Sequence, residues 1–420
     1  MSGIQALTFT DSGYNICYYR MREKVKIWIW RFLQVLASFQ KRNEQVKRSF
    51  TPSLVLVPCE PGSVIGSRGD EAMVYSVLTS FRERNPDGRI MVITSHPDFP
   101  DGDDAKRLNE DFPGIEFVPA WRGHFALCRM YRTIRRVKAT EVYALGADCM
   151  DGYYDDAVSI YLLAVSDLST RLNIKTTLTG FSWNTHPTAA VCKAFKYATK
   201  RVTLNLRDPV SYERFVRQIA GTYRLTARLV ADVAFNLIPK TLVSVTRQSG
   251  KKILAFNLHG MLVAKDKYQE LVDGVARGLN DFVAEHPEVQ VVLVPHDYRP
   301  QGDLDALTQI HGKVPNTQLV SDVLSAAELK GLMSSVDGLF TSRMHLGIAA
   351  LGQGKPIGAF AYQGKFTGLF RHFGLPEDMV LNPAEMDRLP KVLDRFIREL
   401  PMLTRQVQLR IPAVKEMAGV

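Results

Sequence analysis

The sequence predicts an α/β protein with two Rossmann-like domains that face a cleft, preceded by a basic amphipathic helical extension. The chain has 420 residues, which is more than one ordinary hydrophobic core organises. From residue 51 onward, short apolar runs alternate with amphipathic stretches, as in consecutive βα units of parallel sheets. The first 50 residues differ, because they hold a dense basic segment with aromatic side chains.

The extension, residues 1–50, carries nine Lys or Arg against two Glu between Arg20 and Arg48. Its stretch KIWIWRFLQVLASFQKR mixes large apolar side chains with this charge. Such a helix can lie in a membrane interface through residues 20–48, or it can pack on the body of the protein or on another subunit. The rest of the chain is only mildly basic, so we expect no nucleic-acid partner.

The first domain is predicted over residues 51–240. Asp70 is the expected N-cap of a helix whose apolar positions recur at helical spacing. A second helix is expected over residues 156–172. The predicted strands are 53–59, 89–95, 115–119, 141–148, 175–181 and 201–208, and the last unit is 228–235.

The second domain is predicted over residues 250–400, after a joint around 237–251, and a C-terminal helix over 401–420. Ligands of such sheets bind beyond the carboxyl ends of the strands. The predicted strands are 253–259, 289–297, 317–321, 337–342 and 356–362. The predicted helices are 267–286, 325–336 and 344–354.

The stretch TSRMHLGIAALG places an arginine and a histidine at the start of a predicted helix. Ser342 is the expected N-cap, and Arg343 and His345 fall in the first turn, where free backbone N–H groups favour an anion. Arg343 can bind a carboxylate or phosphate through two parallel hydrogen bonds, and His345 can donate or accept a proton near neutral pH. The alternative is a capping turn with a hydrogen-bonded histidine.

Two further cations follow strands. Lys365 lies in a glycine-bounded loop after the next strand, and its strand end is expected beside that of Arg343. Arg207 ends a strand of the first domain, followed by Asp208 as a cap and Pro209 at the first helical position. We expect Arg207, Arg343, His345 and Lys365 to converge on one anion.

The segment LFTSRMHLGIAALGQGKPIGAFAYQGKFTGLFRHFGL resembles the signature of polysaccharide pyruvyl transferases. The pieces GSRGDEAM, RDPVSYERF, ADVAFNL and VLVPHDY agree with that family in order and rough spacing, so the resemblance covers about Val55 to Leu375. It implies a fold like that of two-domain GT-B glycosyltransferases, with transfer of pyruvyl from phosphoenolpyruvate to sugar hydroxyls. The product is a ketal, and phosphate is released.

By position, the resemblance makes His345 the general acid and makes Arg207, Arg343 and Lys365 the residues that hold phosphoenolpyruvate. Asp70 and Asp148 are candidates for the base that activates the sugar hydroxyl, although Asp70 can also be a plain cap. The loop LGADCMDG, with Asp148, and the loop GSRGD, with Arg68, depart from the family pattern. The resemblance implies that the first domain is the acceptor side and the second domain the donor side, so both departures lie on the acceptor side.

The expected partners are phosphoenolpyruvate and a glycan or lipid-linked sugar acceptor, and the oligomeric state is left open. The chemistry needs no cofactor and no metal, and GSVIGSRG matches neither the dinucleotide nor the P-loop motif. The alternatives are a nucleotide-sugar-dependent GT-B glycosyltransferase and a non-catalytic scaffold of the same fold.

The expected location is the cytoplasm, with peripheral contact at the inner face of the membrane as an alternative. The five cysteines are scattered and odd in number, which favours reduced thiols. The start MSGIQALTFTDSGYN lacks the pattern of a signal peptide.

Overall fold

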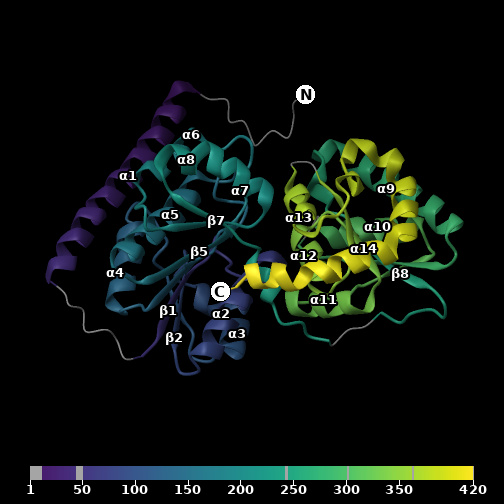
Figure 1. Ribbon diagram of the computed structural model, residues 1–420, viewed down its shortest axis with the longest axis horizontal. Helices are drawn as coiled ribbons and strands as arrows, with labels where there is room; N and C mark the ends of the chain where they lie inside the picture. Colours follow the sequence, from purple (N-terminus) through teal and green to yellow (C-terminus); the bar gives the residue numbers. More distant parts are fainter. Residues whose placement is uncertain (1–11, 44–50, 242–244, 300–301, 362–363, 420) are drawn as a thin grey trace. The chain divides into compact units, whose positions relative to one another are not determined.

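The computed structural model describes residues 12–43, 51–241, 245–299, 302–361 and 364–419 (Figure 1). These residues form two compact units. The N-terminal unit comprises the described parts of Phe9–Gly66 and Met73–Val233, and the C-terminal unit comprises Ser67–Ala72 together with the described parts of Ala234–Gly419. The units thus change at Val233/Ala234, and a six-residue piece of the early sequence groups with the C-terminal unit.

The N-terminal unit is built on a parallel sheet of order β3-β2-β1-β4-β5-β6-β7. Its strands are β1 (Ser53–Val57), β2 (Arg89–Ile93), β3 (Glu116–Val118), β4 (Glu141–Ala144), β5 (Lys175–Phe181), β6 (Thr203–Leu206) and β7 (Thr226–Leu229). β1 and β4 are buried along their whole length, which explains why the sequence shows them as continuous apolar runs.

Helices flank this sheet. They are α1 (Ser12–Asn43), α2 (Arg68–Arg84), α3 (Asp103–Asp111), α4 (Ala126–Arg136), α5 (Asp156–Arg171), α6 (Ala189–Ala194), α7 (Pro209–Phe215) and α8 (Gly221–Tyr223), with a π-helical turn at Val216–Ala220. The predicted cap of α7 is confirmed, because the Asp208 carboxylate accepts from the backbone N–H of Ser211 and Pro209 is the first helical residue.

The C-terminal unit holds a second parallel sheet of order β10-β9-β8-β11-β12-β13. The strands are β8 (Lys252–Phe256), β9 (Val289–Leu293), β10 (Thr317–Leu319), β11 (Gly338–Thr341), β12 (Ile357–Phe360) and β13 (Val380–Leu381). Two parallel sheets with helices confirm the predicted α/β fold class. The short strand β13 was not predicted.

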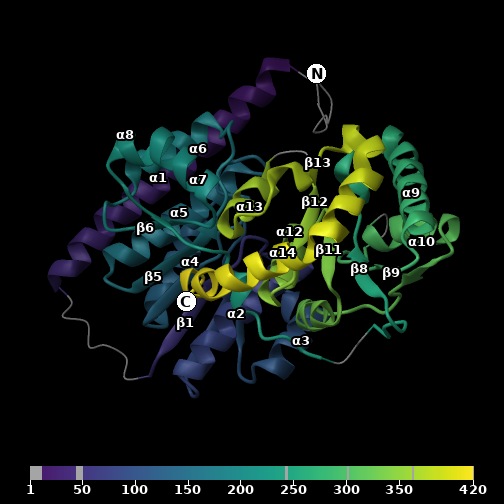
Figure 2. The same cartoon turned by 45° about the vertical axis from the view of Figure 1, so that its right-hand side comes forward.

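The helices of this unit are α9 (Tyr268–Glu285), α10 (Asp303–Lys313), α11 (Ala326–Leu332), α12 (Met344–Gly352), α13 (Lys365–Phe373) and α14 (Leu389–Met417). α14, the yellow helix of Figures 1 and 2, packs against α9, α12 and α13. The predicted C-terminal helix was expected only from residue 401. The helix instead begins at Leu389 and continues through Pro401 and Pro412, because its buried apolar side chains hold it against the unit.

Residues 12–43 of the predicted extension form α1, which packs on α5 and α4, and the rest of the predicted segment 1–50 lies outside the described residues. The Trp30 indole is fully buried and donates to Asp167 Oδ2 at 2.9 Å, and Gln34 Nε2 donates to the same oxygen at 2.7 Å. These contacts attach α1 to the body of the N-terminal unit. Among the described helices, none is both long enough and apolar enough to cross a membrane.

Candidate functional site

Polar residues follow the carboxyl ends of three neighbouring strands in the C-terminal unit. Asn257 and His259 follow β8, His296 and Asp297 follow β9, and Arg343 follows β11. Strands β9, β8 and β11 are adjacent in the sheet, so these residues meet at one edge. This is the edge at which parallel α/β sheets bind their ligands.

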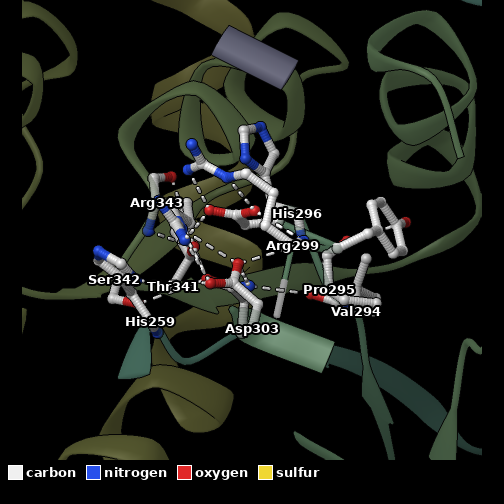
Figure 3. A network of polar contacts seen from close by, with 12 residues as sticks. His259, Val294, Pro295, His296, Arg299, Asp303, Thr341, Ser342 and Arg343 are labelled. Carbon is white, nitrogen blue, oxygen red and sulfur yellow. Dashed lines mark hydrogen bonds and ion pairs between the residues drawn. The ribbon is translucent and has the colours of Figure 1, made fainter. Parts of the chain in front are cut away.

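A buried carboxylate, Asp303, organises this edge (Figure 3). Asp303 is the first residue of α10, and its side chain is fully buried. The Arg343 Nε atom donates to both carboxylate oxygens of Asp303, at 2.9 and 3.1 Å, and Nη2 donates to Oδ1 at 2.6 Å. Burial alone would raise the pKa of Asp303, but His259, whose Nδ1 lies 3.6 Å from Oδ1, and the charge of Arg343 lower it to about 2.

A second carboxylate, Asp297, shares the same arginine. Arg343 Nη2 donates to Asp297 Oδ2 at 2.9 Å, and Arg299 donates to both oxygens of Asp297 at 2.9 and 2.6 Å. Although burial opposes ionisation, the bonds from Arg299 and the charge of Arg343 hold the pKa of Asp297 below its usual range. Arg343 therefore cross-links the start of α12 to the end of β9 and the start of α10.

Amide and hydroxyl groups complete this network. Asn257 Nδ2 donates to Asp303 Oδ2 at 2.8 Å, and Thr341 Oγ1 donates to Asn257 Oδ1 at 3.0 Å. The predicted N-cap of α12, Ser342, was wrong by one residue. Arg343 has the extended backbone of the cap, and the Ser342 hydroxyl instead accepts from the backbone N–H of His259 at 2.5 Å.

His345 is the second helical residue of α12 and lines a narrow pocket within the C-terminal unit. Four of the side chains that line this pocket carry nitrogen: His345, Arg68, His296 and Lys330. The remaining walls are apolar and come from Ala72, Ala234, Leu237, Ala326, Leu329 and Ala349. The free space between these side chains is about 10 Å³, which is room for about one water molecule.

The first turn of α2 forms one wall of this pocket. Gly69 lies so close to the imidazole that an ideal Cβ there would be 2.4 Å from His345 Nδ1. Arg68 bonds to Glu71 at 2.8 Å and stacks over the Tyr298 ring at 5.5 Å. Its buried Nε atom has no hydrogen-bond partner among the described residues, so the pocket holds a cationic donor that a ligand can use.

The start of α2 differs from the prediction. The helix begins at Arg68, two residues before Asp70, which lies in its first turn. The Ser67 hydroxyl accepts from the Asp70 backbone N–H at 3.1 Å and donates to Asp70 Oδ2 at 2.7 Å. Ser67 is therefore the cap, because a serine hydroxyl can satisfy the exposed N–H of the third helical residue.

His296 faces the same pocket in its neutral form. Burial and the charge of Arg343 lower the pKa of His296 to about 3. Its ring can therefore accept one hydrogen bond and donate another at neutral pH, without adding charge.

Lys330 adds a buried amine from α11. Its side chain is 2% exposed, and Nζ donates to the backbone carbonyl of Phe235 at 2.8 Å and to that of Ala234 at 3.4 Å. Burial, helped by the charge of Lys415, lowers the pKa of Lys330 to about 7. This group therefore changes its charge near neutral pH, next to the pocket.

We expect a Lys330→Met variant to lose part of the pH dependence of stability. Between about pH 7 and 10.5 the unfolded lysine is protonated and the folded one is not, so the free energy of unfolding of the wild type rises with pH. Over that interval the gain is roughly 5 kcal/mol relative to the methionine variant. Denaturant titrations of both proteins at several pH values would measure it, and parallel curves would contradict the prediction.

Two predicted site residues belong to the N-terminal unit. Arg207 directly follows β6 and is 4% exposed; its Nη1 bonds to Asp232 at 2.9 Å, and its Nε bonds to Ser182 at 2.8 Å. Asp148 follows β4 and accepts from the Tyr154 hydroxyl at 3.1 Å. Burial opposes the charge of Arg207, but the carboxylates of Asp232 and Asp148 keep its pKa above the ordinary value.

The C-terminal unit thus brings together His345, Arg343 and Arg68, with Asp70 in the same turn of α2 as Arg68. Lys365 is the first residue of α13, after Gly364 in the left-handed conformation, but its side chain lies outside the described part of the structure. Within the described residues, no group of three or more His, Cys, Asp or Glu is placed to hold a metal ion.

The residues that sequence reasoning did not single out are Asp303, Asn257, His259 and Lys330. A signal existed for two of them, because Asn257 and His259 lie within three residues of the end of β8, where parallel sheets bind their ligands. Asp303 and Lys330 had no local signal. Their roles depend on burial by segments distant in sequence.

A family model described as polysaccharide pyruvyl transferase matches residues 68–364. No curated protein matches the chain. Among solved structures, the chain is similar to S. aureus MnaA with UDP (10% identity, TM-score 0.57, 88% of this chain and 94% of that one). It is also similar to the UDP-GlcNAc 2-epimerase from Neisseria meningitidis bound to UDP-GlcNAc (10% identity, TM-score 0.53, 88% of this chain and 97% of that one). A third similar structure is Anabaena HepE with UDP (12% identity, TM-score 0.51, 87% of this chain and 95% of that one). At these identities the likeness shows the fold alone, which is of the GT-B type.

Proposed function

This chain belongs to the polysaccharide pyruvyl transferase family, and we propose that it transfers pyruvyl from phosphoenolpyruvate to sugar hydroxyls of a polysaccharide or lipid-linked glycan. The proposed product is a pyruvate ketal, and phosphate is released. The observation that carries the donor assignment is one pocket in which His345 and Arg68 meet, each in the first turn of a helix.

The polar lining of the pocket suits a small anion, and the side chains must move apart to admit one. Phosphoenolpyruvate carries a phosphate and a carboxylate on one carbon, and helix N-termini with an unpartnered Arg68 N–H favour such charge. Neutral His296 can form hydrogen bonds to the anion without adding a positive charge of its own. The apolar walls exclude water, which strengthens each of these interactions.

The proposed reaction begins with proton transfer from His345 to the methylene carbon of phosphoenolpyruvate. The neighbouring carbon becomes electrophilic, and a first sugar hydroxyl forms a C–O bond to it. Phosphate then leaves with its bridging oxygen, and a second hydroxyl closes the ketal. Of the two hydroxyl protons released, one restores His345 and one balances the departing phosphate.

The roles of the other cations follow from their surroundings. Arg343 is already ion-paired with Asp297 and Asp303, so we propose that it holds the start of α12 in place and offers only part of its guanidinium to the donor. For Arg207 and Lys365, donor binding stays a prediction from the family resemblance.

We propose that the acceptor sugar contacts the N-terminal unit near Asp148. Tyr153 and Tyr154 follow β4, are 50% and 57% exposed, and pack edge to face at 5.1 Å. Exposed aromatic faces next to a carboxylate suit the C–H faces and hydroxyls of a sugar. Asp148 is one candidate base for the hydroxyl, and Asp70 is the other. Arg68 was expected on the acceptor side, but its position favours the donor.

We further propose that the reaction needs no cofactor, because protonation and addition involve no change in oxidation state. Phosphoenolpyruvate is a metabolite of the cell interior, so the proposed reaction takes place on the cytoplasmic side. A lipid-linked acceptor would bring the protein to the inner face of the membrane.

Thermal unfolding with and without phosphoenolpyruvate tests the donor assignment. We expect the ligand to raise the melting temperature of the wild type, and the Arg68→Met variant to need about tenfold more ligand for the same rise. Arg388→Met, which removes an exposed arginine of the same unit, is the matched control. A rise with UDP-GlcNAc instead would indicate a glycosyltransferase, and no rise with either ligand would favour a non-catalytic scaffold.

A further inference from the structure

Helix α1 exposes a continuous apolar stripe. Its five members recur at helical spacing of three and four residues, and 44% to 68% of each is exposed. They are Val25, Trp28, Phe32, Val35 and Phe39. Trp28 and Phe32 stack on each other with ring centroids 6.0 Å apart. Surface apolar residues are usually scattered singly, so a stripe of this length indicates an interaction surface.

The opposite face of α1 is committed to its own unit. Ile29, Trp30, Leu33 and Ala37 are each 5% exposed or less. Trp30 and Gln34 anchor the helix to Asp167. The stripe therefore cannot turn inward without breaking these contacts, and it stays presented to the surroundings.

Exposed positive charge lies on the helix that carries the stripe and on its neighbour α4. Lys24 and Arg31 are exposed on α1 itself, next to Val25 and Phe32. Helix α4, which contacts α1 in the same unit and lies beside it in Figure 1, contains no acidic residue. Its exposed cations, with the one just beyond its end, are Arg132, Arg135, Arg136 and Lys138.

We infer that the stripe docks the protein on a membrane surface that contains anionic lipid. Trp and Phe side chains partition into the headgroup region, while neighbouring Lys and Arg are attracted to the anionic headgroups. Because one face of α1 is packed on α5, the helix lies along the membrane plane and enters it only to the depth of the exposed stripe.

A second copy of the chain is a poorer occupant. The spacing of the stripe could form a two-helix seam, but such seams prefer branched aliphatic residues, and Trp28, Phe32 and Phe39 are aromatic. Along residues 24–39, which hold the stripe, the charged residues of α1 are Lys24, Lys26 and Arg31, and none is acidic. Two copies would bring like charges together.

Co-sedimentation of the full chain with lipid vesicles tests this inference. One set of vesicles contains phosphatidylcholine with phosphatidylglycerol, and the other contains phosphatidylcholine alone. We expect the wild type to bind the anionic set, less so at high salt. Trp28→Ser/Phe32→Ser is expected to weaken binding at least about tenfold, since burial of two aromatic side chains is lost. Arg132→Gln/Arg136→Gln is expected to weaken binding to the anionic set only.

The matched control is Val323→Ser/Leu409→Ser, which removes two exposed apolar side chains of the C-terminal unit and should leave binding unchanged. Unchanged binding by the Trp28/Phe32 variant, or no binding by the wild type, would overturn the inference. So would a wild-type dimer in sedimentation equilibrium that this variant dissociates, because a second copy would then cover the stripe. Phosphoenolpyruvate is absent throughout, so the result does not depend on the proposed reaction.

Discussion

A His345→Gln variant is expected to lose about 10²- to 10⁴-fold in turnover while it still binds phosphoenolpyruvate, because glutamine keeps a hydrogen-bonding side chain but cannot protonate carbon. Phosphate release in the presence of glycans from the native host measures the turnover. The ligand-induced rise in melting temperature measures the binding. Turnover at the wild-type level would show that another group is the acid.

The close contact between His345 and Gly69 gives an independent test of the same role. Gly69→Ala places a methyl group where it would lie 2.4 Å from the imidazole nitrogen, so the ring must move. Displacement of a catalytic group by about 1 Å can lower the rate by up to about 10²-fold. Gly312→Ala is the matched control, since Gly312 lies in α10 with open space around it and alanine there favours the helix.

The second large effect is expected at the buried ion pair. Asp303→Ala should lower the free energy of unfolding by about 3–5 kcal/mol, because Arg343 loses its buried partner and Asn257 loses an acceptor. The contribution of Asp303 is fully present above its unfolded pKa near 4 and is lost as the pH falls toward 2.

Denaturant unfolding measures this change. Glu377→Ala is the control in the same unit, because its 2.8 Å pair with Arg371 is about half exposed and should contribute less than about 1 kcal/mol. A double variant, Asp303→Asn with Arg343→Met, should be less destabilised than the two single changes added together, since neither charge is then left alone. Additive losses would mean that the pair is not coupled.

The strands could be predicted from the sequence because both sheets are parallel and buried, so that each strand is a short apolar run bounded by polar residues. The start of α12 could be predicted to within one residue, with Arg343 and His345 together. The ion pairs of Arg343 with Asp297 and Asp303 could not be predicted from the sequence. Asp303 lies 40 residues earlier in the chain, and its importance comes from its complete burial.

The N-cap of α2 also could not be predicted from the sequence. Asp70 was the expected cap, because Asp is a good capping residue and precedes an apolar-periodic run. Ser67 is equally suitable, and only the backbone decides between them. That Arg68 lies over the Tyr298 ring and lines the same pocket as His345 depends on the tertiary fold, for which the sequence offers no local pattern.

The grouping of Ser67–Ala72 with the C-terminal unit bears on how this protein can be divided or recombined. A fragment that begins at Ala234 contains His345 and the complete second sheet, yet it lacks Arg68 and Gly69, which form one wall of the pocket. The C-terminal unit is therefore not one continuous stretch of sequence, and a cut at Ala234 separates the two parts of the pocket lining. Chimaeras that exchange C-terminal halves between relatives must exchange this early hexapeptide as well, or inherit a pocket with a mismatched wall.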